Sequence, residues 1–174
     1  WSRPYVRAGY SVINVTLPEY DVCLYRPPKK VYGILAAPPC TEFSLMKQLC
    51  KDGNYTYNFK AGLEIVSACM RIILLTQPKW WVIENPKGHL SKWLGSPTFV
   101  FEPWYYGDNY KKSTYLWGSF NLPQRTVFFK PLFLKSFVEA RRTIYLKKYS
   151  NLTQQERSSI TPPGFAKAFF EANK

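Results

Sequence analysis

The chain has 174 residues, of which 46% are hydrophobic and 18% aromatic, a composition that excludes a disordered protein and suits one domain with a sizeable core. Its 24 Lys and Arg outnumber its 11 Asp and Glu, and the net charge of +13 favours a polyanionic partner, with nucleic acid ahead of a membrane surface. A basic protein with a merely solvated surface would show the same balance. The four cysteines are too irregularly spaced for a disulfide framework, and a single histidine gives no zinc pattern, so we expect no metal. No segment is long and apolar enough to span a membrane, and we expect a reduced, cytoplasmic protein.

The first part of the chain contains three short predicted elements. Residues 1–10 predict a helix that ends at Gly9, and residues 11–15 (SVINV) predict a short strand. Asp21-Val22 closes the loop that follows. Residues 31–37 (VYGILAA) then form an apolar run, which suits a strand buried on both faces.

A cysteine follows this predicted strand directly. Pro38 and Pro39 stop the strand, because neither can donate a backbone hydrogen bond. Cys40 is thereby placed on a stiff loop at the carboxyl end of a strand, where open α/β sheets bind their ligands. Such a thiol could be a nucleophile, although inert buried cysteines are commoner.

A second strand with a polar tip follows in the next part of the chain. After a polar loop around Gly53, residues 61–76 predict a crossover helix packed on the sheet. Residues 80–84 (WWVIE) predict the next buried strand, stopped by Asn85-Pro86. In a parallel sheet the two tips would lie side by side, which places Cys40 and Glu84 in one crevice.

The last part of the chain is aromatic and basic. Residues 98–127 predict strands with a turn at Gly107-Asp108, and interleave Lys and Arg with aromatic residues. This pattern suits a nucleic-acid groove and an ordinary β-ribbon equally. Residues 136–149 predict a basic amphipathic helix or a helix–strand pair, and residues 158–173 a helix whose start is marked by Thr161-Pro162.

A cysteine facing a carboxylic acid in a basic domain indicates pyrimidine chemistry. Position 5 of a pyrimidine becomes nucleophilic when a thiolate adds at C6, a role that fits Cys40. An acid that hydrogen-bonds N3 assists this addition, and Glu84 fits that role. Asn85 would hold the loop or a substrate amide.

Five segments, in order along the chain, resemble motifs of the DNA cytosine-5 methyltransferases. APPCTEFS (37–44) resembles that family's catalytic loop, and VIENP (82–86) its Glu-Asn-Val motif, with proline in the last position as in phage-type members. FNLPQR (120–125) resembles the motif whose Gln and Arg lie near the flipped base. Residues 106–118 and 157–173 resemble segments of small phage and prophage members. Asp21-Val22 additionally resembles the family's contact to the adenine end of S-adenosylmethionine.

The resemblance implies a single Rossmann-like catalytic domain over residues 1–174, with a mostly parallel sheet, a last antiparallel strand pair and helices on both faces. It implies transfer of a methyl group from S-adenosylmethionine to C5 of cytosine in DNA, with base flipping. The site residues that we expect are catalytic Cys40, Glu84, Asn85 and Arg125, cofactor-binding Asp21, Thr16, Pro38 and Pro39, and substrate-binding Ser44, Gln124, Lys111 and Lys112.

The chain also departs from the family pattern. The glycine-rich loop that cradles the methionine end of the cofactor is absent, so we expect it, with the first strand, upstream. Thr16 stands where the family has an acidic residue for the ribose, and Arg125 follows Gln124 without an intervening residue. Residues 133–157 leave room for a minimal target-recognition domain or none, and a partner subunit could supply one.

Three other functions fit the same residues. A thymidylate synthase-like enzyme also uses a Pro-Cys nucleophile, but the Glu-Asn-Pro motif and the last segment argue against it. RNA methylation is possible on the same scaffold. A degenerate relative would bind DNA without holding the cofactor, and Thr16 and the absent glycine loop support that alternative.

Overall fold

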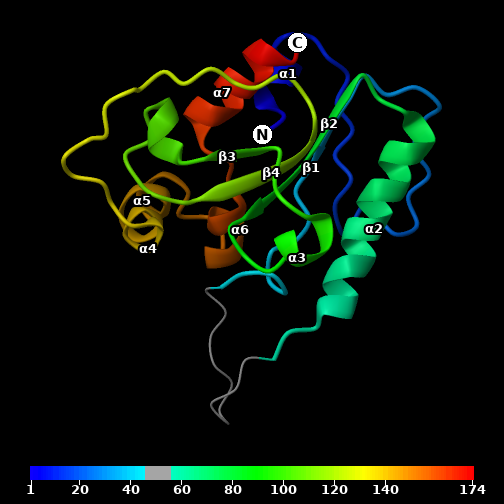
Figure 1. The fold of residues 1–174 in the computed structure, drawn as a ribbon, viewed down its shortest axis with the longest axis horizontal. Helices are drawn as coiled ribbons and strands as arrows, with labels where there is room; N and C mark the ends of the chain where they lie inside the picture. Colours follow the sequence, from blue (N-terminus) through cyan, green and yellow to red (C-terminus); the bar gives the residue numbers. More distant parts are fainter. Residues whose placement is uncertain (46–55) are drawn as a thin grey trace. The chain divides into compact units, whose positions relative to one another are not determined.

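The computed structural model describes residues 1–45 and 56–174, and the predicted loop around Gly53 lies outside them. The chain divides into two compact units. Unit 2 comprises Ile13–Val100 and Thr114–Phe120, and unit 1 comprises Trp1–Val12, Phe101–Ser113 and Asn121–Lys174. Figure 1 shows the course of the chain through both units.

A four-stranded sheet, in the order β1-β2-β4-β3, forms the centre of unit 2. Strand β1 (Gly33–Ala36) pairs in parallel with β2 (Trp80–Pro86), so the predicted parallel neighbours are confirmed. Strand β2 pairs antiparallel with β4 (Thr114–Ser119), and β3 (Phe99–Phe101) completes the sheet. The fold is therefore mixed α/β, and the prediction of a mostly parallel sheet is not confirmed.

Strand β2 continues beyond its predicted end. The prediction that Asn85-Pro86 stops it is wrong, because Asn85 pairs with Tyr115 and Pro86 with Thr114 of β4. A proline is tolerated at the end of an antiparallel ladder, since the missing N–H removes a single hydrogen bond. On the other side of β2 the parallel ladder does end, at the pair of Ala36 and Ile83.

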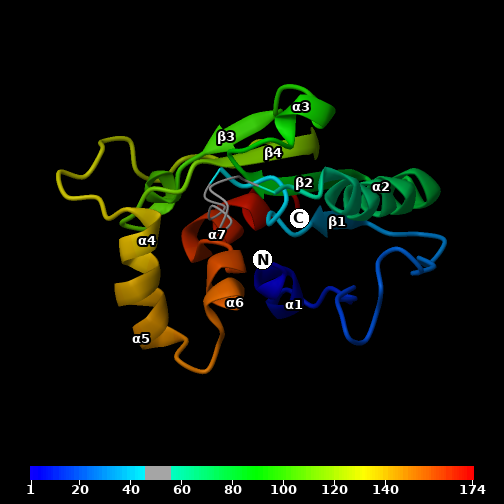
Figure 2. The same cartoon turned by 90° about the horizontal axis from the view of Figure 1, so that it is seen from below.

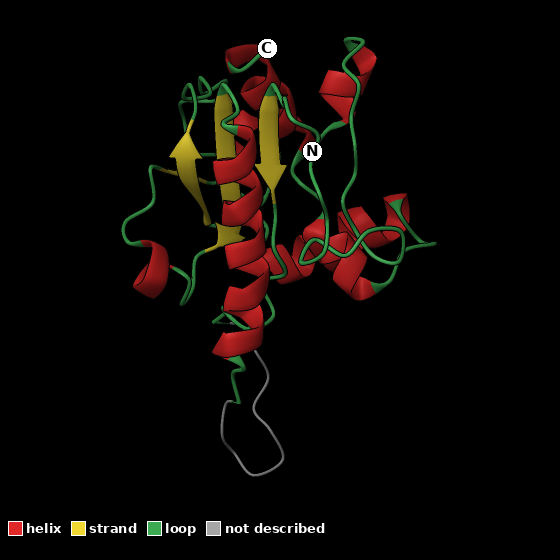
Figure 3. Cartoon of the chain, turned by 90° about the vertical axis from the view of Figure 1, so that its right-hand side faces the viewer, coloured by secondary structure: helices red, strands yellow, loops and turns green. Residues whose placement is uncertain are grey.

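Helix α2 (Phe59–Thr76) is the predicted crossover helix and lies along one face of the sheet (Figure 3). It begins two residues earlier than predicted, because the Asn58 side chain accepts the N–H of Ala61 at 3.0 Å as an N-cap. It ends at Gln77, whose φ of 44° is left-handed. Its apolar side packs into the core of unit 2, which comprises Ala36, Phe43, Val66, Cys69, Ile73, Ile83, Leu90 and Trp117.

The predicted strand over residues 11–15 is wrong. This segment has no regular secondary structure, and its Ile13 side chain is 54% exposed. Its β-branched residues favour an extended backbone, but a strand also needs a ladder partner. None of the described strands pairs with it.

The helices of unit 1 follow the predicted pattern in part, since the helix Gln154–Ser159 was not predicted and the helix predicted over 158–173 begins only at Pro163. Helix α1 (Arg3–Arg7) ends before Gly9, whose φ of 85° is left-handed. The 3-10 helix η1 (Pro103–Tyr106) is a single short turn. In unit 2, α3 (Ser91–Leu94) is a similarly short helix. The predicted basic helix forms as α4 (Phe137–Ala140), a π-helical turn η2 (Arg141–Tyr145) and α5 (Leu146–Lys148), one continuous run in Figure 2. Helix α6 (Gln154–Ser159) runs back beside it, and α7 (Pro163–Ala172) begins directly after Thr161-Pro162 as predicted.

Aromatic rings form much of the interior of unit 1. Phe165 of α7 stacks on Phe101 with 3.7 Å between ring centroids, and Phe169 contacts Trp1 edge to face. The hydroxyls of Tyr110 and Tyr145 share a buried hydrogen bond of 2.7 Å. Such pairs fix ring orientation as well as burying apolar area. The aromatic residues named here therefore stabilise the interior of unit 1.

The described ranges, 1–45 and 56–174, contain no helix with the length and apolar character needed to cross a membrane. The same ranges hold no cluster of His, Cys, Asp and Glu that could bind a metal ion.

Candidate active site

The tips of β1 and β2 lie side by side at their carboxyl ends. The parallel ladder ends at Ala36 and Ile83, so the loop with Cys40 and the tip with Glu84 leave the sheet from neighbouring strands. Glu84 is half-buried and pairs with Leu116 on the antiparallel side, which fixes its backbone. The predicted juxtaposition of the two tips is confirmed, while the catalytic roles stay predictions.

Asn85 connects the two tips directly. Its Nδ2 donates to the carbonyl of Pro38 at 2.9 Å, and the residue is only 1% exposed. The donor can only be the amide, because a carbonyl accepts. This bond holds the backbone of the Pro-Pro-Cys loop against β2, so Asn85 serves the loop-holding role that the sequence suggested. Its Oδ1 is buried and has no hydrogen-bond partner among the described residues.

The loop after Cys40 is bonded to the loop after β2. The carbonyl of Cys40 accepts the N–H groups of Phe43 and Ser44 at 2.9 and 2.8 Å, which closes a tight turn. Ser44 forms an antiparallel bridge with Gly88, and His89 N–H donates to the Phe43 carbonyl at 2.8 Å. A Cβ on Gly88 would lie 2.2 Å from that carbonyl oxygen, so the close approach requires glycine.

Phe43 anchors this turn in the core. Its side chain is fully buried and packs against Gly62 of α2, where an added Cβ would lie 2.7 Å from the ring. The Glu42 carboxylate accepts the N–H of Asn58, just before α2, at 2.6 Å. The turn that carries Cys40 is therefore fixed on both sides, by α2 and by the loop after β2.

The other described cysteines are poorly placed for chemistry. Burial raises the pKa of Cys69 to about 11, so its thiol stays protonated and inert inside the core. Cys23 is exposed on the 16–25 segment, and desolvation, followed by the charge of Asp21, raises its pKa. Cys40 is half-buried at a strand tip, the placement expected of a nucleophile.

The predicted cofactor residues Thr16 and Asp21 lie in irregular turns. The Thr16 carbonyl accepts the N–H of Tyr20 at 3.0 Å, and an Asp21 oxygen accepts the N–H of Cys23 at 2.8 Å. Both residues are exposed. A carboxylate has two acceptor oxygens, so Asp21 can also accept an exocyclic amine such as that of adenine.

Arg71 of α2 holds this segment, a role that the sequence analysis missed. Its guanidinium donates to the carbonyls of Val22 and Tyr25 at 3.1 and 3.0 Å, and to that of Cys23 at 3.4 Å. In the sequence Arg71 shares one helix face with Glu64 and Ser67, at i, i+3 and i+7 spacing. This polar face on a largely apolar helix was the available indication of such a contact.

The predicted base-contacting residues belong to unit 1. Gln124 is exposed, whereas the Arg125 guanidinium lies 3.8 Å from the centroid of the Tyr105 ring. The same loop is held by Tyr106, whose hydroxyl donates to the Pro123 carbonyl, and by two bonds between Asn121 and Asn173. The segments resembling the family's Gln-Arg motif and its last motif are thus bonded to each other within one unit.

The two predicted substrate lysines differ in their surroundings. Lys111 is exposed, whereas the Lys112 Nζ donates to the Ser158 carbonyl at 3.0 Å and lies over the Phe137 ring. The Lys112 N–H donates to Glu102 at 2.8 Å. Burial raises the pKa of Glu102 in spite of this bond. Lys112 therefore has a structural role, and Lys111 is the better candidate for a phosphate contact.

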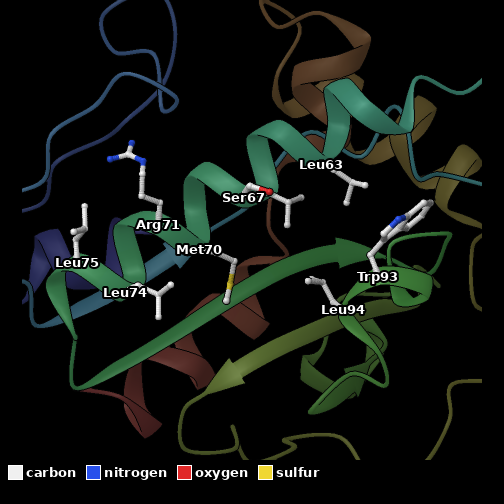
Figure 4. A pocket seen from close by; sticks show the side chains of 9 residues that line it. Leu63, Ser67, Met70, Arg71, Leu74, Leu75, Trp93 and Leu94 are labelled. Carbon is white, nitrogen blue, oxygen red and sulfur yellow. The ribbon is translucent and has the colours of Figure 1, made fainter.

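An apolar hollow between α2 and α3 is separate from these residues. Figure 4 shows Met70 and Leu94 pointing toward each other across it, with Trp93 at one end. Leu74 and Leu75, at the other end, are 70% and 63% exposed. None of the predicted site residues lines it.

The fold and the site together define a mixed α/β protein with a Pro-Cys loop bonded to a Glu-Asn-Pro strand tip. In an alignment of 130 positions that covers 67% of its length, the chain is 30% identical to a "Probable DNA (cytosine-5)-methyltransferase" of Frog virus 3 (isolate Goorha). With the ordered motifs, this match assigns the chain to the DNA cytosine-5 methyltransferase family. The chain spans 59% of the length of that relative. No family model and no solved structure matches the chain.

Proposed function

We propose that the protein transfers a methyl group from S-adenosylmethionine to C5 of cytosine in DNA. The observation that carries this proposal is the bond from Asn85 to the Pro38 carbonyl, which joins the Pro-Cys loop to the Glu-Asn-Pro tip at the ends of parallel strands. The family relationship supports the same reaction. We further infer a Rossmann-like sheet for the whole protein, supported by the parallel β1–β2 pair.

In the proposed reaction the Cys40 thiolate is the nucleophile. Its Sγ forms a bond to C6 of the cytosine, and the electrons of the C5–C6 double bond make C5 nucleophilic. Glu84 hydrogen-bonds N3 and the exocyclic amine, and so stabilises the charge that develops on the ring. C5 takes the methyl group as its bond to the sulfonium sulfur breaks, with S-adenosylhomocysteine as the leaving group. A base then removes the C5 proton, the double bond re-forms, and the Cys40 thiolate leaves.

The residues present fit one end of the methyl donor. Asp21 offers an exposed carboxylate at a fixed turn for the adenine amine, and Pro38 and Pro39 give a rigid apolar wall beside Cys40. Thr16 offers a hydroxyl for the ribose in place of a carboxylate. When bound, the donor supplies a methyl group on a sulfonium, an electrophile that a carbon nucleophile can attack.

The remaining candidates position the DNA. Gln124 is exposed and free of steric cover for a contact to the extruded base, and Arg125, held by Tyr105, fixes the loop that carries Gln124. Lys111 would neutralise a phosphate. Ser44 would orient a phosphate or sugar near the turn of Cys40.

The proposal is tested by covalent trapping. The full-length protein should form an adduct with DNA containing 5-fluorocytosine when S-adenosylmethionine is present, because fluorine replaces the C5 proton whose removal would release Cys40. Cys40→Ala should abolish the adduct, whereas Cys23→Ser, the matched change at an exposed thiol, should retain it. The absence of an adduct from the wild-type protein would contradict the enzymatic function. Calorimetry with S-adenosylhomocysteine then identifies a degenerate DNA-binding relative, which would bind duplex but not this ligand.

A further inference from the structure

The segment 127–135 (VFFKPLFLK) of unit 1 exposes an unusual amount of apolar surface. Phe128, Phe129, Leu132 and Phe133 are 73%, 90%, 94% and 86% exposed. Figure 1 shows the segment, in yellow, as a wide loop that leads into α4. Four large apolar side chains exposed within six residues of one segment indicate an interaction surface, because the hydration of apolar surface is unfavourable.

Both ends of this loop are fixed. At its start, the N–H groups of Thr126 and Val127 donate to the Tyr105 carbonyl at 3.1 and 3.0 Å. At its end, Lys135 forms a parallel bridge with Tyr110, and the Lys111 N–H donates to the Lys135 carbonyl at 3.0 Å. The backbone on both sides of the exposed apolar side chains is therefore fixed by hydrogen bonds.

The surroundings of the loop in the sequence are basic throughout. Residues 109–138 contain no Asp or Glu, and their charged residues are Lys111, Lys112, Arg125, Lys130 and Lys135. Lys130 lies at the middle of the loop and is exposed. The partner should thus combine an apolar interior with a negative rim.

A DNA duplex has this combination, with stacked bases between two rows of phosphates. A second copy of the chain does not, because association through this loop would bring two net charges of +13 together. The loop also begins two residues after Arg125, in the segment that the proposed function places on DNA. Apolar side chains flanked by basic ones are the means by which proteins wedge open a base step.

We propose that Phe128, Phe129, Leu132 and Phe133 form a wedge that inserts between base pairs of the DNA, with Lys130 on a neighbouring phosphate. This inference rests on the proposed function and deepens it. By unstacking a step of the duplex, the wedge lowers the cost of extruding a cytosine.

The test compares two double variants of the full-length protein. Phe129→Ala/Leu132→Ala removes the most exposed side chains of the wedge, and Leu74→Ala/Leu75→Ala is a matched control on α2. The probe is a duplex with a mismatched cytosine and 2-aminopurine in the adjoining steps, whose fluorescence rises on unstacking. The wild type and the control should raise it, and the wedge variant should lose the rise and bind about tenfold more weakly. Lys130→Gln should keep the rise and reduce the salt slope of binding by about 1.

Equal fluorescence and affinity for the wedge variant and the wild type would overturn the wedge. So would dimerisation that the wedge variant abolishes, or binding to anionic vesicles without any fluorescence change on DNA. Failure of the proposed function is distinguishable from these outcomes. If the wild-type protein unstacks the duplex but forms no adduct with 5-fluorocytosine DNA, the wedge proposal is supported and the proposed methyltransferase function is contradicted.

Discussion

The two strand tips and the 16–25 segment both belong to unit 2, but they are held in different ways. The tips are fixed by a parallel ladder, by an antiparallel ladder and by the buried Asn85 amide. The 16–25 segment is irregular and mostly exposed: Thr16 and Asp21 accept backbone N–H groups in local turns, and the Arg71 guanidinium donates to three further carbonyls. The catalytic candidates at the tips are thus preorganised by pairing between strands, whereas the cofactor candidates Thr16 and Asp21 lie in a segment that Arg71 ties to α2.

Substitutions at the tips and in the 16–25 segment should therefore differ in whether they affect chemistry or binding. A nucleophile gains rate when its position is fixed before the substrate arrives, since little ordering remains for the transition state. A binding segment can order as its ligand binds, at a cost in affinity. We therefore expect changes at the tips to lower the rate of adduct formation, and changes around Arg71 to lower the affinity for the cofactor.

The largest effect is expected from Asn85→Asp. The substitution keeps the shape but replaces the Nδ2 donor by a carboxylate oxygen that faces the Pro38 carbonyl in a buried position. Two buried acceptors that face each other without a hydrogen bond lower the free energy of unfolding by about 1–3 kcal/mol, and the loss is larger when one of them is charged. Adduct formation should fall by at least about a hundredfold, measured as the initial trapping rate with 5-fluorocytosine DNA.

The control is Lys87→Ala, a substitution of an exposed residue on the loop that follows β2, and this variant should form the adduct at the wild-type rate. Asn121→Asp does not serve as a control, because the Asn121 amide donates to the Ala172 carbonyl. Gln124→Glu does not serve either, since Gln124 is a candidate for base contact. An Asn85→Asp protein that is folded and traps normally would show that the tip bond has no part in positioning Cys40.

A smaller effect is expected from Gly88→Ala. The new Cβ would lie 2.2 Å from the Phe43 carbonyl oxygen, so the bridge to Ser44 must open. Overpacking against backbone costs about 1–3 kcal/mol, and urea denaturation should show this loss. The trapping rate should fall as well, because the Cys40 turn loses one of its two supports. Unchanged stability and an unchanged trapping rate would show that the bridge between Ser44 and Gly88 does not help to position Cys40.

The sequence predicted the tips well because their determinants are local. The apolar runs before Pro38-Pro39 and Asn85-Pro86 identify β1 and β2 without knowledge of the fold, and the start of α7 at Pro163 is equally local. The end of β2 was predicted too early, because its pairing with β4 through Pro86 depends on residues about 30 positions away. The predicted strand over residues 11–15 failed because a strand depends on a partner that local propensity does not reveal. The role of Arg71 was equally hidden, since its acceptors lie 46–49 residues away in the sequence.

The smallest effect on chemistry, and the clearest separation of the two regions, is expected from Arg71→Ala. Removing the guanidinium frees the carbonyls of Val22 and Tyr25, and the partly exposed site limits the loss of stability to about 1–2 kcal/mol. The affinity for S-adenosylhomocysteine should fall about tenfold by calorimetry, because the turn of Asp21 must order on binding. At saturating S-adenosylmethionine the trapping rate should return to the wild-type value.

Arg71→Lys tests the geometry of this contact, since one ammonium cannot span several acceptors as a guanidinium does. The lysine variant should bind S-adenosylhomocysteine nearly as weakly as the alanine variant. A trapping rate that stays low at saturation would mean that the two regions are not separate, and that the segment held by Arg71 also helps to place Cys40.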